Sequence, residues 1–179
     1  MKNHIRNSKL VLASFFLALC YILPFFTGQI REIGAMLCPM HIPVLLCGFL
    51  CGWPWGLAVG LIAPLLRALT LGMPPFFPTA VCMAAELGVY GLIAGLMYRL
   101  FPKKLPYIYC SLLTAMVMGR LVWGLAMLFS LGVQGLSFGF SAFFSAAIIN
   151  SLPGIILQIT FVPFIVRLVN IKSNLSNGK

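Results

Sequence analysis

Acidic side chains are nearly absent from this sequence. Of its 179 residues only two are acidic, Glu32 and Glu86, against 12 that are basic, and 8% of the chain is charged while 61% is hydrophobic. A soluble domain of this length covers its core with charged and polar side chains, and this chain has too few of them. The composition therefore predicts an all-α membrane protein whose exterior faces lipid, with residues 1–179 forming one integral membrane domain.

The placement of positive charge argues against nucleic acid as a partner. The formal net charge is +10, but the basic residues stand at the edges of apolar runs instead of forming one basic stretch. That distribution is typical of membrane proteins, which keep Lys and Arg in their cytoplasmic loops. We expect a lipid membrane around the chain and no nucleic acid bound to it.

Sequence motifs of common catalytic and metal sites are also missing. The chain has no Walker loop, no H-E-x-x-H and no Cys-x-x-Cys. With so few acids and two histidines, it offers little acid–base chemistry, so we expect no enzyme activity and no cofactor. The cysteines are scattered through apolar runs, and the only histidine near a cysteine pair, His41, precedes Cys47 by six residues. Packing against apolar neighbours is the expected role of the cysteines, and no metal site is predicted.

Apolar runs predict six transmembrane helices. They cover about residues 10–26, 41–53, 56–71, 79–100, 106–131 and 140–168. Six crossings place both termini on the same side of the membrane, and nine of the twelve basic residues then fall in the cytoplasm. The first run follows a basic segment but precedes no small-x-small cleavage pattern, so we expect a retained helix instead of a signal peptide.

Helix breakers and one long loop divide these runs. Trp53-Pro54-Trp55 is expected to separate the second helix from the third at the water interface. Pro153-Gly154 is expected to interrupt the sixth helix in the middle of its span. Residues 27–40 are too polar to cross the membrane and form an outer loop, which is either a lid or a plain connector.

Several polar side chains fall inside the predicted helices, where lipid penalises them. An ionised side chain near the bilayer centre costs roughly 2.5 to 3.5 kcal/mol on insertion scales, so such residues face a cavity or one another. Counting residues from the outer helix ends places four of them in the outer half of the membrane or near its midplane. The candidates are Arg67, Glu86, Arg120 and Asn150, with His41 at the mouth.

Aromatic neighbours extend this candidate site. Tyr90 follows Glu86 by four residues, and Trp123 follows Arg120 by three, so each shares a helix face with a charge. The pattern predicts a pocket for a small polar molecule that enters from outside. Two arginines against one glutamate leave a surplus positive charge, which favours a carboxylate ligand. The alternative is a buried Arg67–Glu86 or Arg120–Glu86 pair that only fixes how the helices pack.

One stretch carries a family resemblance. The run PMHIPVLLCGFLCGWPWGLAVGLIAPLLRALTLGMPPFFPTA, followed by AAELGVYGLIAGLMY, resembles the S components of energy-coupling-factor (ECF) vitamin importers, in the branch of pantothenate-type subunits and their relatives. The six-helix layout and the long first outer loop are similar to that family as well. The resemblance implies an ECF S-component-like bundle in the bacterial plasma membrane, which captures a vitamin or vitamin precursor from outside while the first loop closes over the pocket.

The resemblance also implies partners. Such subunits work with a transmembrane coupling protein and two cytoplasmic ATPases, and they contact the coupling protein through an Ala-x-x-x-Ala pattern on the first helix. Ser14 and Ala18 stand at the matching positions, with serine in place of the first alanine. Residues this small at a spacing of four let another helix approach closely.

Three interpretations remain open at the level of sequence. The first is an S component for a small carboxylate such as pantothenate. The second is an S component for an amine-bearing or heterocyclic ligand (pyridoxine-like, pyrimidine or deazapurine) contacted by Glu86. The third is a membrane assembly subunit without a ligand, in which the charges only pair helices.

Overall fold

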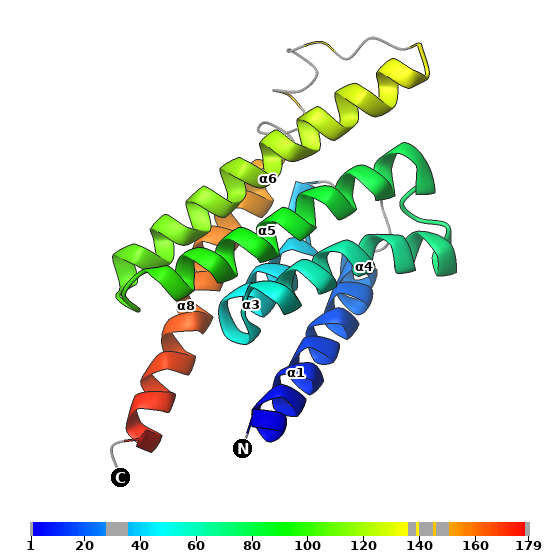
Figure 1. Ribbon diagram of the computed structural model, residues 1–179. Coiled ribbons are helices and arrows are strands. Elements are labelled where there is room, and N and C mark those ends of the chain that lie inside the picture. Colours follow the sequence, from blue (N-terminus) through cyan, green and yellow to red (C-terminus); the bar gives the residue numbers. More distant parts are fainter. Residues whose placement is uncertain (1, 28–35, 136–138, 140–144, 146–150, 178–179) are drawn as a thin grey trace.

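The computed structural model describes residues 2–27, 36–135, 139, 145 and 151–177, and this part of the chain folds entirely into helices and their connections (Figure 1). The elements in chain order are α1 (Lys2–Ile22), the 3₁₀ helix η1 (Leu23–Thr27), α3 (His41–Cys51), α4 (Trp53–Leu71), the π-helical turn η2 (Phe76–Ala80), α5 (Val81–Leu100), α6 (Leu105–Val133) and α8 (Leu152–Asn177). The predicted all-α fold is confirmed for these residues.

Five of these helices are long and apolar enough to cross a membrane. The candidate spans are Arg6–Phe26, Trp53–Leu71, Phe76–Leu100, Leu105–Val133 and Leu152–Ile171. The helix α3 is apolar but has 11 residues, which gives it a length of about 16 Å against a hydrocarbon core of about 30 Å. The second predicted span is therefore too short to cross the bilayer as a helix by itself.

The helix α3 nevertheless lies at the centre of the bundle. It packs against α1, α4, α5 and α8, and nine of its residues are buried. Its backbone contacts α4 and α5 directly, because a Cβ on Gly56 of α4 would lie 2.7 Å from both the Gly48 Cα of α3 and the Gly91 carbonyl oxygen of α5. Only glycine permits this approach, which brings three helices into a tight central layer.

The junction between α3 and α4 differs from the prediction. Trp53-Pro54-Trp55 does not form a connector; it is the first turn of α4. Gly52 alone makes the bend, with φ at 100°, a conformation that a side chain disfavours. Proline fits the first turn of a helix because the N–H that it lacks has no helical partner there, so Pro54 starts the helix where we expected it to separate two helices.

The last helix is also shifted relative to its prediction. The helix α8 covers Leu152–Asn177 where residues 140–168 were expected, and most of 140–150 lies outside the described residues. Pro153 and Gly154 belong to the first turn of α8 and therefore do not break it in mid-span. Most of the predicted outer loop, residues 28–35, likewise lies outside the described part.

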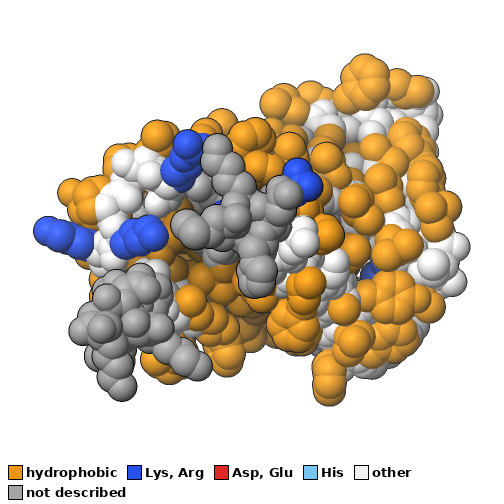
Figure 2. Space-filling model, turned by 60° about the horizontal axis from the view of Figure 1, so that its bottom comes forward, with side chains coloured by type: hydrophobic (Ala, Val, Ile, Leu, Met, Phe, Trp, Pro, Cys, Tyr) orange, Lys and Arg blue, Asp and Glu red, His pale blue; other side chains and the backbone are white. Residues whose placement is uncertain are grey.

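Basic side chains gather toward one end of the bundle. The start of α1 and the end of α8 both lie at the bottom of Figure 1. Six exposed basic residues occupy the terminal parts of α1 and α5, the α5–α6 connection and the second half of α8: Arg6, Lys9, Arg99, Lys103, Lys104 and Arg167. In Figure 2 the Lys and Arg side chains of the bottom face lie mainly on its left half, and the rest of that face is largely hydrophobic.

Candidate functional site

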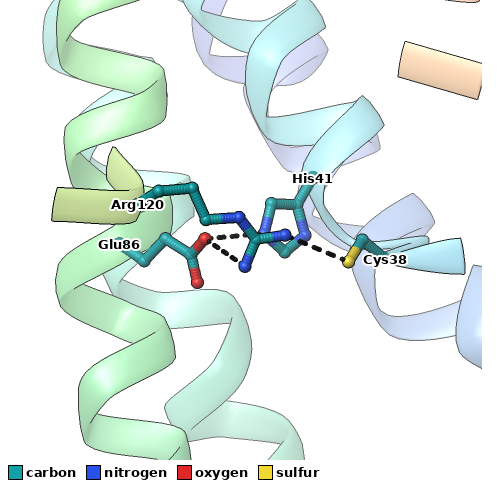
Figure 3. A network of polar contacts seen from close by, with 4 residues as sticks. All are labelled: Cys38, His41, Glu86 and Arg120. Carbon is teal, nitrogen blue, oxygen red and sulfur yellow. Dashed lines mark hydrogen bonds and ion pairs between the residues drawn. The ribbon is translucent and has the colours of Figure 1, made fainter. Parts of the chain in front are cut away.

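Four polar side chains from three parts of the chain meet inside the bundle (Figure 3). Glu86 projects from the second turn of α5, and Arg120 projects from α6 toward it. The Arg120 Nη1 atom lies 3.0 Å from Glu86 Oε1, and His41 Nε2, from the first turn of α3, lies 3.4 Å from the same oxygen. Arg120 Nη2 donates to the Sγ atom of Cys38 at 3.6 Å. We call Cys38, His41, Glu86 and Arg120 the Glu86 cluster.

The Glu86 cluster is buried yet incompletely paired. Glu86 is 1% exposed and His41 is 3% exposed, while the Arg120 side chain is 16% exposed. Neither ring nitrogen of His41 makes a hydrogen bond within the described residues, and neither does Arg120 Nε. A buried donor or acceptor without a partner costs about 1 to 3 kcal/mol, which a bound polar molecule would recover. The cluster therefore offers unpaired donors and acceptors in an otherwise apolar interior.

Tyr90 forms one wall of the cluster. Its ring meets the His41 ring edge to face, with centroids 5.1 Å apart, and the residue is 1% exposed. Gly119 of α6 makes room for it, since a Cβ there would lie 2.6 Å from two atoms of the Tyr90 ring. The predicted association of His41, Glu86, Tyr90 and Arg120 is thus present in the fold.

Cys38 is a member of the cluster that sequence reasoning assigned only to packing. It has a positive φ of 47° just before α3, and it is buried. The backbone before it also contacts α8, because a Cβ on Gly154 would lie 2.7 Å from the Met36 carbonyl oxygen. The signal available in the sequence was its position three residues before His41, at the end of the outer loop.

Arg67 lies apart from the cluster, although the sequence grouped it with Glu86. Its Nη1 atom donates to the Tyr21 carbonyl oxygen at 2.8 Å, and its guanidinium lies over the Phe25 ring, 5.1 Å from the centroid. The residue is 4% exposed. The last carbonyls of a helix lack helical partners and favour a cation, so Arg67 caps the end of α1. Within the described residues, the partner of Glu86 is Arg120 and not Arg67.

Two predicted residues, Trp123 and Asn150, and one residue that was not predicted, Gln158, remain. Trp123 is half-buried on α6, one turn after Arg120. Asn150 lies outside the described residues, so its place relative to the cluster is open. Gln158 of α8 is fully buried, and both of its amide atoms lack hydrogen-bond partners in the described part of the chain.

Ser14 and Ala18 line a separate surface groove. Both are exposed on α1, and the groove has a volume of about 270 Å³ with Leu17, Tyr21, Ile22 and Leu66 as its other lining residues. The Ser14 hydroxyl donates to the Leu10 carbonyl oxygen of its own helix at 3.0 Å, so it presents little polarity to a partner. The predicted small-residue contact is thus open to the surface between α1 and α4.

No group of three or more His, Cys, Asp or Glu side chains able to hold a metal ion occurs among the described residues. Five of the six cysteines are buried and Cys110 is exposed.

A family comparison gives one match. The sequence profile of the family described as "ECF transporter, substrate-specific component" matches residues 8–166. That range includes the Glu86 cluster, Arg67 and the Ser14–Ala18 groove. No curated protein and no solved structure was found to match the chain.

Proposed function

Because the chain belongs to the family of ECF transporter substrate-specific components, we propose that it captures a vitamin or vitamin precursor from outside a bacterial cell. The family consists of transporter subunits that bind substrate and work in the membrane with a coupling protein and ATPases, and its members are not enzymes. In this proposal residues 1–179 form one membrane domain, and the coupling protein and two ATPases drive release of the ligand inward.

The observation that carries the proposal is the incomplete pairing of the Glu86 cluster. A cluster that served only to join helices would be expected to satisfy its own donors and acceptors, since each unsatisfied one is costly in an apolar interior. Here His41 Nδ1 and Arg120 Nε are buried without a hydrogen bond in the described residues, and His41 Nε2 has only its 3.4 Å contact with Glu86. We propose that a ligand completes these hydrogen bonds, with Tyr90 and Trp123 packing on its ring or chain and Asn150 reaching it from the segment before α8.

The charges favour one class of ligand over the other. Arg67 is engaged at the end of α1, and Arg120 is paired with Glu86, so the surplus of positive charge that favoured a carboxylate is absent from the cluster. The charges of Glu86 and Arg120 therefore offset each other. We infer a neutral or amine-bearing heterocycle, a pyridoxine-like, pyrimidine or deazapurine compound, that accepts from Arg120 or His41 and donates to Glu86.

A small carboxylate such as pantothenate is the second candidate. The unpaired Arg120 Nε supports it, because a guanidinium can hold a carboxylate on one edge while another edge remains on Glu86. The resemblance of residues 39–80 to pantothenate-type subunits favours it as well.

The proposal includes an orientation in the membrane. Exposed Lys and Arg side chains at one end of the bundle support a cytoplasmic location for both termini. An even number of crossings is then required, so we propose that the shorter apolar helix α3 is the sixth segment within the membrane. The Glu86 cluster falls in the outer half, as expected for capture from outside.

Two variants separate the ligand classes. Binding of a vitamin panel is measured with the purified chain in detergent, for the wild type, Glu86→Gln and Arg120→Gln. A heterocyclic ligand predicts that Glu86→Gln loses affinity by more than a hundredfold for an amine-bearing compound, whereas a carboxylate ligand predicts the larger loss for Arg120→Gln. Arg67→Gln is the matched control, because it removes a buried charge away from the cluster. Absence of any tight ligand, or equal losses in all three variants, would refute the proposed site.

A further inference from the structure

A second groove opens at the opposite end of the bundle from the Glu86 cluster. It has a volume of about 260 Å³, and its floor is the α3–α4 junction, with Lys9 of α1 and Arg99 of α5 at its sides. The junction contributes Cys51, Gly52, Trp53, Pro54 and Trp55. We call these seven residues the Lys9–Arg99 groove. It shares no residue with the Ser14–Ala18 groove.

Two cations face this groove, and no carboxylate of the described residues neutralises them. Lys9 and Arg99 are both exposed, and within the described residues neither forms an ion pair. The chain has only two acidic side chains. Glu86 is buried on Arg120 and His41, and Glu32 lies outside the described part. A pair of like charges held on one concave surface attracts an anion.

The groove floor adds to this attraction. The helix α4 starts at Trp53 and carries no acidic residue in its first turn. The N-terminus of a helix carries the positive end of the helix dipole, which favours an anion. Its backbone adds few donors here, because Pro54 has no N–H and the Gly56 N–H donates to the Gly52 carbonyl oxygen. Arg99 can hold two oxygens of a phosphate at once, and Lys9 supplies a point charge beside it.

The groove lies at the level where apolar spans end. One candidate span starts at Arg6, another starts at Trp53, and a third ends at Leu100. The groove is therefore at the boundary between hydrocarbon and water, where lipid headgroups lie. Trp53 and Trp55 are half-buried in it, and tryptophan is enriched at this boundary because its ring is apolar and its N–H is polar.

We propose that the Lys9–Arg99 groove binds the phosphate group of an anionic phospholipid. Lys9 and Arg99 contact the phosphate oxygens, and the two tryptophan rings pack along the glycerol and the first acyl carbons. A soluble phosphate would satisfy the cations but would leave the tryptophan rings uncovered, which is why a lipid is the expected occupant. This inference does not depend on the ligand of the Glu86 cluster.

Native mass spectrometry of the full chain tests the proposal. Detergent-solubilised protein is titrated with phosphatidylglycerol or with phosphatidylcholine, and the bound fraction is measured for the wild type and for Lys9→Gln/Arg99→Gln. We expect the apparent affinity for phosphatidylglycerol to fall more than tenfold in this double variant. The matched control is Lys103→Gln/Lys104→Gln, which removes two exposed charges near the same end but outside the groove. It should change the affinity less than threefold.

Three outcomes would overturn the inference. Equal losses in both double variants would show that only overall charge attracts the lipid. Equal retention of phosphatidylcholine would show that the groove does not select an anionic headgroup. Inorganic phosphate at millimolar concentration could displace phosphatidylglycerol and raise the thermal stability of the protein as much as the lipid does. That result would assign the groove to a soluble anion. Thermal unfolding without lipid checks folding. Lys9→Gln/Arg99→Gln should match the wild type because both side chains are exposed, and the control variant should lose no more than the Lys103 contact with the Tyr98 ring.

Discussion

The pair between Glu86 and Arg120 yields the sharpest prediction, because a structural pair and a ligand site respond differently to its removal. The experiment is a double-mutant cycle of Glu86→Leu, Arg120→Met and the two combined. Each single change leaves one buried charge without its counterion, whereas the double change leaves none. The cycle therefore separates the cost of an unpaired charge from the loss of ligand contacts.

The magnitude follows from the geometry. At the 3.0 Å separation between Arg120 Nη1 and Glu86 Oε1, Coulomb's law gives about 5.5 kcal/mol with an effective dielectric constant of about 20. Breaking a buried pair by removing one partner costs about 3 to 5 kcal/mol, and replacing both partners by apolar residues is often neutral or stabilising. We expect each single variant to lose about 3 to 5 kcal/mol of unfolding free energy, and the double variant to lie within about 1 kcal/mol of the wild type.

Stability and binding are then compared in the same preparations. Unfolding free energies are measured in mixed micelles. Ligand affinity is measured by calorimetry, with the compound that co-purifies with the protein or that binds in the vitamin panel. If the cluster binds ligand, the double variant is stable but binds more than a hundredfold more weakly. A double variant that is as stable as the wild type and binds equally well would show that the pair only joins α5 to α6. Single variants with unchanged stability would refute the reasoning about the buried charge.

Three further predictions concern the rest of the bundle. Arg67→Gln should lower thermal stability, because the end of α1 loses a charge-assisted hydrogen bond, and should change ligand affinity less than threefold; a large affinity loss with intact stability would return Arg67 to the site. Ala18→Leu should block co-purification with the coupling protein by filling the α1 groove, while ligand binding persists; undiminished co-purification would exclude that groove as the contact. Gly91→Ala should destabilise by about 1 to 3 kcal/mol, because its Cβ would overlap the Gly56 backbone, whereas Gly132→Ala, with open space around it, is the control; equal effects of the two would contradict the tight central layer.

Composition by itself determined the class of this protein. A chain with 61% hydrophobic residues and two acidic side chains cannot cover a soluble surface, so helices that satisfy their own backbone in lipid were the expected solution. Five of the six predicted helices correspond to spans of sufficient length, because apolar length is read directly from sequence. The helix boundaries were less accurate: Trp53-Pro54 suits the first turn of a helix as well as it suits a connector, and only the bend at Gly52 distinguished the two.

Pairing between helices was decided by the tertiary structure. Local spacing places Tyr90 beside Glu86 and Trp123 beside Arg120, because residues three or four apart share a helix face. It does not give the rotation of one helix against another, so Arg67 and Arg120 were equal partners for Glu86 in the sequence. The glycine contacts between α3, α4 and α5 fix that rotation. With this rotation Arg120 and His41 contact Glu86, and Arg120 also donates to Cys38. Arg67 instead contacts the end of α1.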